Sequence, residues 1–252
     1  MRENRIRKNW SQDKAVLCGW LAIPSSFSAE VIANEDLDAV LVDTQHGMIE
    51  VQTAITMLQA ISTKGPAPMV RVNWNDPAPI MKLLDAGAYG VICPMINSGE
   101  ECERFVKACR YPPDGYRSFG PARGLLYGGP DYFEHANASV VTMAMIETRE
   151  AMGRLDEIMS TKGLDGVYIG PSDLSIGLGH PPSLDPTAKE VLDAIDLIYK
   201  TARKHNIVPG IHTPGGKVAK KWIDKGFRLC ALSNDARLLA AQVKSEIAAA
   251  RG

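Results

Sequence analysis

The chain has 252 residues, 45% of them hydrophobic, which supplies enough apolar surface for one large core. Its 28 basic and 29 acidic side chains give a formal net charge of −1, so no basic surface for nucleic acid or anionic lipid is indicated. No apolar run reaches the roughly 18 residues that a membrane span requires. We therefore expect a single domain over residues 1–252 whose partner is a small molecule, with no nucleic-acid and no membrane partner.

The cysteines and the amino terminus bear on the cellular compartment. Five cysteines form an odd set without CxxC spacing: Cys18, Cys93, Cys102, Cys109 and Cys230. Three of them lie inside apolar runs, where a reduced thiol packs as a small hydrophobic side chain. The charged start "MRENRIRKNW" is followed by no secretory hydrophobic region. These features predict a cytoplasmic protein.

Eight short runs rich in Val and Ile alternate with segments of helical period. In chain order the runs cover residues 16–23, 38–43, 67–72, 90–95, 140–147, 166–170, 207–212 and 229–234. Apolar residues at helical spacing lie between or after them, for example Val51, Ile55 and Leu58, then Leu155, Ile158 and Met159, and finally Leu239, Val243 and Ile247. Such alternation predicts a parallel sheet covered on both faces.

Eight strand–helix units in a chain of this length favour a closed (β/α)8 TIM barrel over an open doubly wound sheet. The one long connection, residues 111–139, is rich in Pro, Gly and aromatic residues and therefore suits an ordered excursion. Because it comes after the fourth strand, we expect it at the functional rim of the barrel.

Active sites of such barrels lie where strands end and the following loops begin. The polar residues at these places are Trp20, Asp43, His46, Arg71, Glu147, Asp173, His212 and Asn234. Glu147 closes the fifth strand and Asp173 follows the sixth, so both carboxylates should reach a common point. Two such anions with room left for water and substrate describe a Mg²⁺ or Mn²⁺ site. Alternatively, each carboxylate caps a helix, or Glu147 pairs with Arg149.

Asp43 and His46 come from "VDTQHG", where a strand ends in a turn. A carboxylate that holds an imidazole makes it a better proton acceptor, so His46 is a candidate general base. Alternatively, His46 is bound into a rim loop without a catalytic role. Arg71 ends a buried strand and needs an anionic or carbonyl partner, which is the substrate or, structurally, Asp43 or Glu147.

Several other kinds of site lack their required residues. The strand segments contain no lysine, so we expect neither a Schiff-base lysine nor PLP. There is no GxGxxG, "GIHTPGGKV" misses the P-loop spacing by one residue, and no GxSxG elbow occurs. The remaining set suits abstraction of a proton next to a carbonyl: a metal and Arg71 stabilise the enolate oxygen, and His46 or a metal-bound water takes the proton. Backbone N–H groups around Ser172 and Asp173 could hold a substrate carboxylate, so a 2-oxo acid is indicated.

Seven segments of the chain, in this order, are "WLAIPSSFSAE", "VDTQHG", "VRVNW", "LLDAGAYGVICPM", "RYPPDGYRSFG", "MIET" and "GLDGVYIGPSDLSIGLG". Together they resemble the metal-dependent class II pyruvate aldolases of the HpcH/HpaI family, and the resemblance covers essentially the whole chain. It implies reversible aldol cleavage of 4-hydroxy-2-oxo acids, giving pyruvate or hydroxypyruvate and an aldehyde through a metal-stabilised enolate. The enzyme would be a carbon–carbon lyase.

The resemblance also implies roles for particular residues. Glu147 and Asp173 would bind a divalent metal ion (Mg²⁺, Mn²⁺ or Co²⁺). Arg71 would contact the keto oxygen of pyruvate, and Asp43 and His46 would form the acid–base dyad.

The same resemblance extends to the substrate pocket and the assembly. Pro171, Ser172 and Asp173 would grip the substrate carboxylate, and Trp20 would line the pocket. The protein would form a homotrimer or homohexamer, in which the last helix, about residues 235–251, packs on a neighbouring subunit.

Two positions depart from the family pattern. Met145 stands where well-known members carry Gln, and Gln45 stands where they often carry Glu. Both changes remove polar groups near the metal or the base. His212 does not belong to the pattern and could meet the distal part of the acceptor or only fill the rim.

Other functions remain open from the sequence. The first is a lyase of the citrate-lyase β-subunit or malyl-CoA-lyase type. The second is a phosphate-binding barrel isomerase, prompted by Gly215 and Gly216, although "LSNDA" after the last strand offers no matching glycine-rich loop. The third is a non-catalytic binder of 2-oxo acids.

Overall fold

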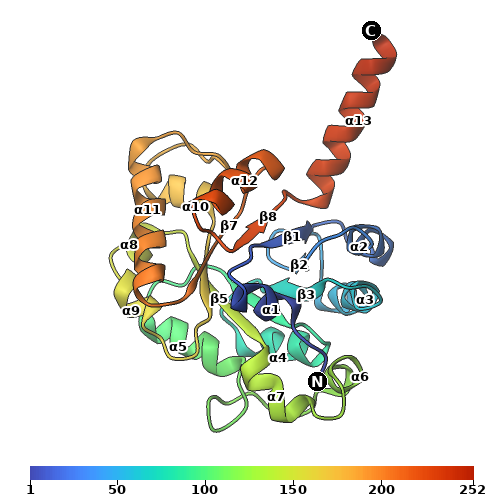
Figure 1. The fold of residues 1–252 in the computed structure, drawn as a ribbon, viewed down its shortest axis with the longest axis vertical. Helices are drawn as coiled ribbons and strands as arrows, with labels where there is room; N and C mark the ends of the chain where they lie inside the picture. Colours follow the sequence, from blue (N-terminus) through green and yellow to red (C-terminus); the bar gives the residue numbers. More distant parts are fainter.

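Eight parallel strands close into one barrel in the computed structural model, which describes residues 1–252 (Figure 1). The strands are β1 (Val16–Leu21), β2 (Ala39–Asp43), β3 (Ala67–Arg71), β4 (Gly90–Cys93), β5 (Val141–Ile146), β6 (Gly166–Ile169), β7 (Val208–Ile211) and β8 (Leu229–Ala231). Each strand pairs with the next, and β8 pairs with β1. Every strand lies within one of the eight predicted runs, so the predicted (β/α)8 barrel is confirmed.

Thirteen helices surround or extend the barrel. They are α1 (Arg5–Ser11), α2 (Ser26–Ala33), α3 (Val51–Ile61), α4 (Pro77–Asp85), α5 (Gly99–Ala108), α6 (Ala122–Gly128), α7 (Tyr132–Ser139), α8 (Arg149–Met152), α9 (Leu155–Met159), α10 (Pro171–Gly177), α11 (Lys189–Lys204), α12 (Gly216–Asp224) and α13 (Asp235–Arg251). Ser25, Ser98 and Thr148 begin helices by accepting a backbone N–H, which satisfies a group that the helix itself cannot pair. None of the helices is both long and apolar enough for a membrane crossing.

Alternate residues of each strand face two separate cores. Leu41 and Met69 point into the barrel, where they belong to a cluster of 15 buried residues. Val40 and Val42 point outward into a cluster of 48 residues between the sheet and the helices. Because both faces are buried, the strands are apolar throughout. All five cysteines are free and buried.

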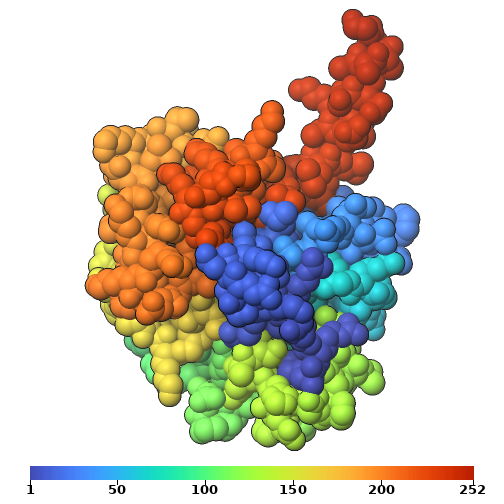
Figure 2. Space-filling model, viewed as in Figure 1, coloured from blue at the N-terminus to red at the C-terminus, as the bar shows by residue number.

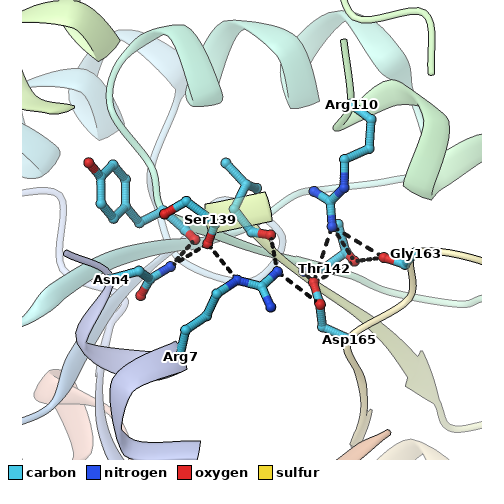
Figure 3. Close-up of polar contacts among 9 residues, drawn as sticks. Asn4, Arg7, Arg110, Ser139, Thr142, Gly163 and Asp165 are labelled. Carbon is cyan, nitrogen blue, oxygen red and sulfur yellow. Dashed lines mark hydrogen bonds and ion pairs between the residues drawn. The ribbon is translucent and has the colours of Figure 1, made fainter. Parts of the chain in front are cut away.

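The amino-terminal end of the barrel is closed by α1 and fixed by a cluster of charged residues (Figure 3). Arg7 of α1 donates from Nη2 to Asp165 Oδ1 at 2.9 Å and from Nε to the Ser139 carbonyl at 2.9 Å. Arg110 donates from Nη2 to Asp165 Oδ2 at 3.1 Å. The same carboxylate oxygen accepts the backbone N–H of Thr142. Asp165 therefore ties together α1, the segment after α5, and the start of β5.

The long connection 111–139 lies at this amino-terminal end, so its predicted place at the functional rim was wrong. The segment contains α6 and α7, which lie near the chain's amino terminus in Figure 1. Arg2 donates its backbone N–H to the Gly128 carbonyl, and Asn4 donates from Nδ2 to Ser139. The physical reason is topological: α5 intervenes between β4 and the segment, and a barrel helix returns the chain to the end where the next strand starts.

The last helix, α13, projects away from the barrel (Figure 1), and the space-filling view shows most of it free of contact with the other elements (Figure 2). Its predicted apolar stripe is present but exposed: Leu239, Val243 and Ile247 expose 59%, 49% and 45% of their surface. The stripe therefore predicts the helix correctly, but it does not pack against this chain's own core.

Candidate active site

A pocket of about 300 Å³ opens at the carboxyl ends of the strands. Its lining includes nine residues singled out from the sequence: Trp20, Asp43, His46, Arg71, Pro171, Ser172, Asp173, His212 and Asn234. A larger groove of about 700 Å³ runs between α5 and α9 on the outside of the barrel, away from these strand ends.

Asp43 and Arg71 end neighbouring strands in direct register and form a two-pronged ion pair. Arg71 donates from Nε to Asp43 Oδ1 at 2.9 Å and from Nη2 to Oδ2 at 2.5 Å. Trp20 donates from Nε1 to the same carboxylate at 3.0 Å. Burial acts to raise the pKa of Asp43, but the Arg71 hydrogen bonds and charge, with Trp20, lower it below its ordinary value. Asp43 is therefore an anion that orients Arg71.

His46 lies at the exposed rim of the same turn, but its ring does not contact Asp43 through a hydrogen bond. Instead, Asp43 Oδ1 accepts the backbone N–H groups of Gln45 and His46, at 3.0 and 3.3 Å. The expectation that Asp43 holds the imidazole is not met here, because its lone pairs are used by Arg71, Trp20 and the turn. Gly47 permits this turn: a Cβ there would lie 2.2 Å from the Asp43 carbonyl oxygen.

Glu147 is 3% exposed and follows β5 directly. Its Oε1 accepts the backbone N–H of Met95, at 2.9 Å, while Oε2 accepts no hydrogen bond. Met95 has a left-handed backbone with φ 55°, which turns its N–H toward the carboxylate. Burial raises the pKa of Glu147 to about 7, and the negative charge of Asp173 acts in the same direction.

Asp173 is exposed in the first turn of α10, after β6. Since β5 and β6 pair at Ile146 and Ile169, the structure brings the two predicted carboxylates to one rim. Capping does not account for them, because Thr148 and Gly170 occupy the N-cap positions of α8 and α10.

The pairing of Glu147 with Arg149 is also absent. The Arg149 guanidinium instead contacts Glu190 at 4.0 Å and the Gly177 carbonyl at 3.1 Å. No group of three or more His, Cys, Asp or Glu side chains gathers here. The two carboxylates are thus free of the structural roles that the sequence left open.

His212 at the end of β7 is packed among aromatic rings. Its centroid lies 4.8 Å from that of Trp20 in an edge-to-face arrangement, and its Nδ1 lies 3.3 Å from the Tyr168 hydroxyl. Burial, followed by the positive charge of Arg71, lowers the pKa of His212 to about 4. The imidazole is therefore neutral near pH 7.

The pocket lining also contains residues that the sequence reasoning missed, among them Tyr168, Leu184 and Arg237. Tyr168 stood in an apolar run, and only the period-2 alternation of β6 would have placed it on the inner face. Arg237 could have been found from Asn234, three residues earlier: Asn234 caps α13, and its side chain accepts the backbone N–H of Arg237. Leu184 comes from a loop after α10, for which no pattern was available.

This fold and site define a barrel enzyme with two carboxylates and an arginine at the carboxyl ends of its strands. The HpcH/HpaI aldolase/citrate lyase family model matches residues 17–241, so the chain belongs to that family. The chain is 43% identical to a hydroxypyruvate/pyruvate aldolase of Rhizorhabdus wittichii, covering 98% of this chain and 99% of that one.

Two further proteins illustrate the similarity. A 4-hydroxy-2-oxo-heptane-1,7-dioate aldolase of Shigella flexneri is 39% identical over 88% of this chain and 83% of its own length. A crystal structure of a family protein from Burkholderia cenocepacia superposes with a TM-score of 0.92 at 26% identity, covering 99% of this chain and 100% of that one. The suspected family is confirmed.

Proposed function

We propose that the protein catalyses reversible aldol cleavage of 4-hydroxy-2-oxo acids to pyruvate or hydroxypyruvate and an aldehyde. The aldolase activities named for relatives that match nearly the whole chain support this reaction. The observation that supports the proposal is that Asp173 and Arg71 line one pocket, while Glu147, outside its lining, is buried close enough for both charges to act on its pKa. The proposed enzyme is a carbon–carbon lyase, and no lysine lines its pocket.

The proposed cofactor is a divalent metal ion, Mg²⁺, Mn²⁺ or Co²⁺, held by Glu147 and Asp173. The donor set fits such an ion, because Glu147 is buried with one oxygen that accepts no hydrogen bond and lies beside a second carboxylate. When bound, the ion would supply positive charge that stabilises the enolate oxygen of the 2-oxo acid. Gly170 leaves space for this carboxylate: a Cβ at Gly170 would lie 2.5 Å from Glu147 Oε2.

Arg71 is the residue of this chain that contacts the keto oxygen in our proposal. Two of its three guanidinium nitrogens are bound to Asp43, and Nη1 has only the sulfur of Met145, at 3.9 Å. That nitrogen can therefore donate to a substrate oxygen without breaking the ion pair. Its charge favours loss of a proton from the adjacent carbon.

His46 is the proposed base for that proton. Its side chain lies at the exposed edge of the pocket, and its position is fixed through the backbone hydrogen bond to Asp43. In the cleavage direction, the same group would remove the proton from the substrate hydroxyl as the carbon–carbon bond breaks.

The start of α10 is the proposed site for the substrate carboxylate. Pro171 has no N–H, and Ser172 and Asp173 supply backbone N–H groups where the chain enters the helix. Trp20, already bound to Asp43, forms an adjoining wall of the pocket.

The assembly and the compartment are part of the proposal. The exposed stripe of α13 suits packing on a neighbouring subunit in a homotrimer or homohexamer. Five free cysteines suit the reducing cytoplasm.

Removal of the metal tests the function. After dialysis against EDTA, aldol cleavage should be lost, and Mg²⁺, Mn²⁺ or Co²⁺ should restore it. Proton NMR in heavy water would follow exchange of the pyruvate methyl protons in the same samples. Activity that persists without metal contradicts the metal-dependent reaction, and pyruvate binding without exchange or cleavage indicates a non-catalytic binder.

A further inference from the structure

The loop after β4 binds one of the two carboxylate oxygens of Glu147. Met95 donates its backbone N–H to Oε1 at 2.9 Å, whereas Oε2 accepts no hydrogen bond. Oε2 lies beside the end of β6, because a Cβ at Gly170 would be 2.5 Å from it. Asp173 follows the same strand. The free oxygen of Glu147 is therefore on the side of the second proposed metal ligand.

Asn97 fixes this loop through both ends of its side-chain amide. Its Nδ2 donates to the Met95 carbonyl at 3.2 Å, and its Oδ1 accepts the hydroxyl of Thr148. Thr148 directly follows Glu147 along the chain. Asn97 therefore ties the residue that donates to Glu147 to the residue that comes after Glu147.

The chemistry of its partners sets the orientation of this amide. The Thr148 hydroxyl accepts the backbone N–H of Ala151 at 3.0 Å, so its own hydrogen is available for donation to Asn97 Oδ1. The carbonyl of Met95 can only accept a hydrogen bond, so it takes the Asn97 N–H. A reversed amide would place two oxygens against each other with no hydrogen between them.

Met95 needs this support because its backbone is left-handed, with φ 55°. Residues with a side chain rarely adopt this conformation, and they keep it where the surrounding contacts hold it. The neighbouring Ile96 is 1% exposed in the outer core, and Glu101 Oε2 accepts the backbone N–H of Asn97 at 2.7 Å. The loop is thus held by the core and α5 on one side and by Thr148 on the other.

A carboxylate with one oxygen already bound offers a metal ion only the other oxygen. Ca²⁺ takes roughly six to eight oxygen ligands and often binds both oxygens of one carboxylate. Mg²⁺ is smaller, requires octahedral geometry and is bound by one or two carboxylates together with water. A held Oε1 of Glu147 therefore disfavours Ca²⁺ more than it disfavours the smaller ions Mg²⁺, Mn²⁺ and Co²⁺.

We propose that Asn97 is a positioning residue that keeps Glu147 a single-oxygen ligand and so makes the site prefer Mg²⁺, Mn²⁺ or Co²⁺ to Ca²⁺. The proposal rests on the metal site proposed above and adds the residue that sets its selectivity. Asn97 acts through Met95 and Thr148 and does not itself bind the ion. Without its amide, the Met95 N–H is free to turn away, and both oxygens of Glu147 become available to one ion.

Calorimetry of the metal-free full-length protein with Mn²⁺ and with Ca²⁺ gives the ratio of the two affinities. Wild type should prefer Mn²⁺. Asn97→Leu replaces the amide by an apolar side chain of the same branched shape, and it should lower the ratio by about 10-fold or more. Thr148→Val breaks the same link from its other end and should also lower the ratio, whereas Thr148→Ser keeps the hydroxyl and should retain it.

Asn137→Leu is the matched control. The Asn137 amide likewise donates to a backbone carbonyl, that of Tyr111 at 2.9 Å, and accepts the backbone N–H of Tyr111 at 2.7 Å, but it belongs to α7 at the amino-terminal end of the barrel. This variant should bind both ions like wild type.

The possible results separate the role of Asn97 from the metal site itself. A wild type without preference for Mn²⁺, an unchanged ratio in Asn97→Leu or Thr148→Val, or an equal drop in Asn137→Leu overturns the role of Asn97 alone. Mn²⁺ binding by Glu147→Gln that is as tight as that of wild type contradicts the proposed metal site as well.

Discussion

Arg71 and Asp43 face each other in register across β2 and β3, and two guanidinium nitrogens bind the two carboxylate oxygens. The geometry leaves Nη1 for a substrate and fixes the plane in which it points. Both side chains of the pair are nearly buried. Removing one of them therefore leaves the charge of the other uncompensated in a place that water reaches poorly.

Asp43→Ala should therefore lower both stability and activity. We expect the free energy of unfolding to fall by about 3 kcal/mol, because Arg71 loses its buried partner. The activity of the folded fraction should also fall, since Arg71 and the turn of His46 lose their orientation. Urea unfolding and steady-state kinetics measure the two effects. Asp13→Ala removes an exposed partner of Arg228 and should leave both close to wild type.

Gly170→Ala tests whether space beside Glu147 is needed for the metal. The backbone at Gly170 has φ −93°, which alanine can adopt, so strain is not the issue. The added Cβ would lie 2.5 Å from Glu147 Oε2 and displace the carboxylate. We expect Mn²⁺ affinity, measured by calorimetry, to fall about 10- to 100-fold.

Two control variants are compared with Gly170→Ala. Glu147→Gln, which lacks the charged oxygen, should weaken Mn²⁺ binding at least as much. Gly120→Ala meets no atom within 4 Å and should bind like wild type. Wild-type affinity in Gly170→Ala would contradict Glu147 as a ligand held in this place.

His46→Ala should slow exchange of the pyruvate methyl protons by about 100-fold or more, which is a typical contribution of a positioned base. Pyruvate binding should change much less, since Arg71 and α10 supply the proposed contacts. Exchange by proton NMR and binding by calorimetry separate these effects. Unchanged exchange would assign the base role to a metal-bound water in place of His46.

The sequence predicted the fold well because strands buried on both faces are unmistakably apolar, and their spacing matched βα units. It also placed Glu147, Asp173 and Arg71 together, since strand ends of a barrel meet at one rim. The expected hydrogen bond between Asp43 and the His46 ring is absent, because closeness along the chain does not decide which donors a carboxylate accepts. Residues 111–139 were placed at the wrong end of the barrel, because α5 was not counted. That helix runs from the end of β4 back to the amino-terminal end of the barrel.

His212 makes stability depend on pH. Its folded pKa is lowered from 6.5 to about 4, so between these values the unfolded chain binds a proton that the folded chain does not. The stabilisation of the folded state by the neutral His212 side chain is therefore fully present above pH 6.5 and is lost as the pH falls toward 4. Between pH 7 and pH 5, wild type should lose about 1 to 2 kcal/mol more than His212→Gln. Urea midpoints at both pH values measure this, with His135→Gln as an exposed control expected to follow wild type.

Asp165→Ala should lower the stability of the protein and leave its catalytic activity nearly unchanged. Asp165 lies at the amino-terminal end of the barrel, where it binds Arg7, Arg110 and the backbone of Thr142. Arg110 is 4% exposed, so loss of its partner leaves a buried charge and should cost about 3 kcal/mol. The active site is at the opposite end, so kcat/KM of the folded enzyme should stay within about 3-fold of wild type.

Thermal unfolding and kinetics below the transition separate these effects of Asp165→Ala. Asp156→Ala removes an exposed partner of Lys204 and His205 and should leave the melting temperature near that of wild type. A large loss of kcat/KM in folded Asp165→Ala would mean that the cluster at the amino-terminal end acts on the site through the barrel. A melting temperature equal to that of wild type would mean that Arg7 and Arg110 find other partners, which their remaining contacts with the Val140 and Gly163 carbonyls could provide only in part.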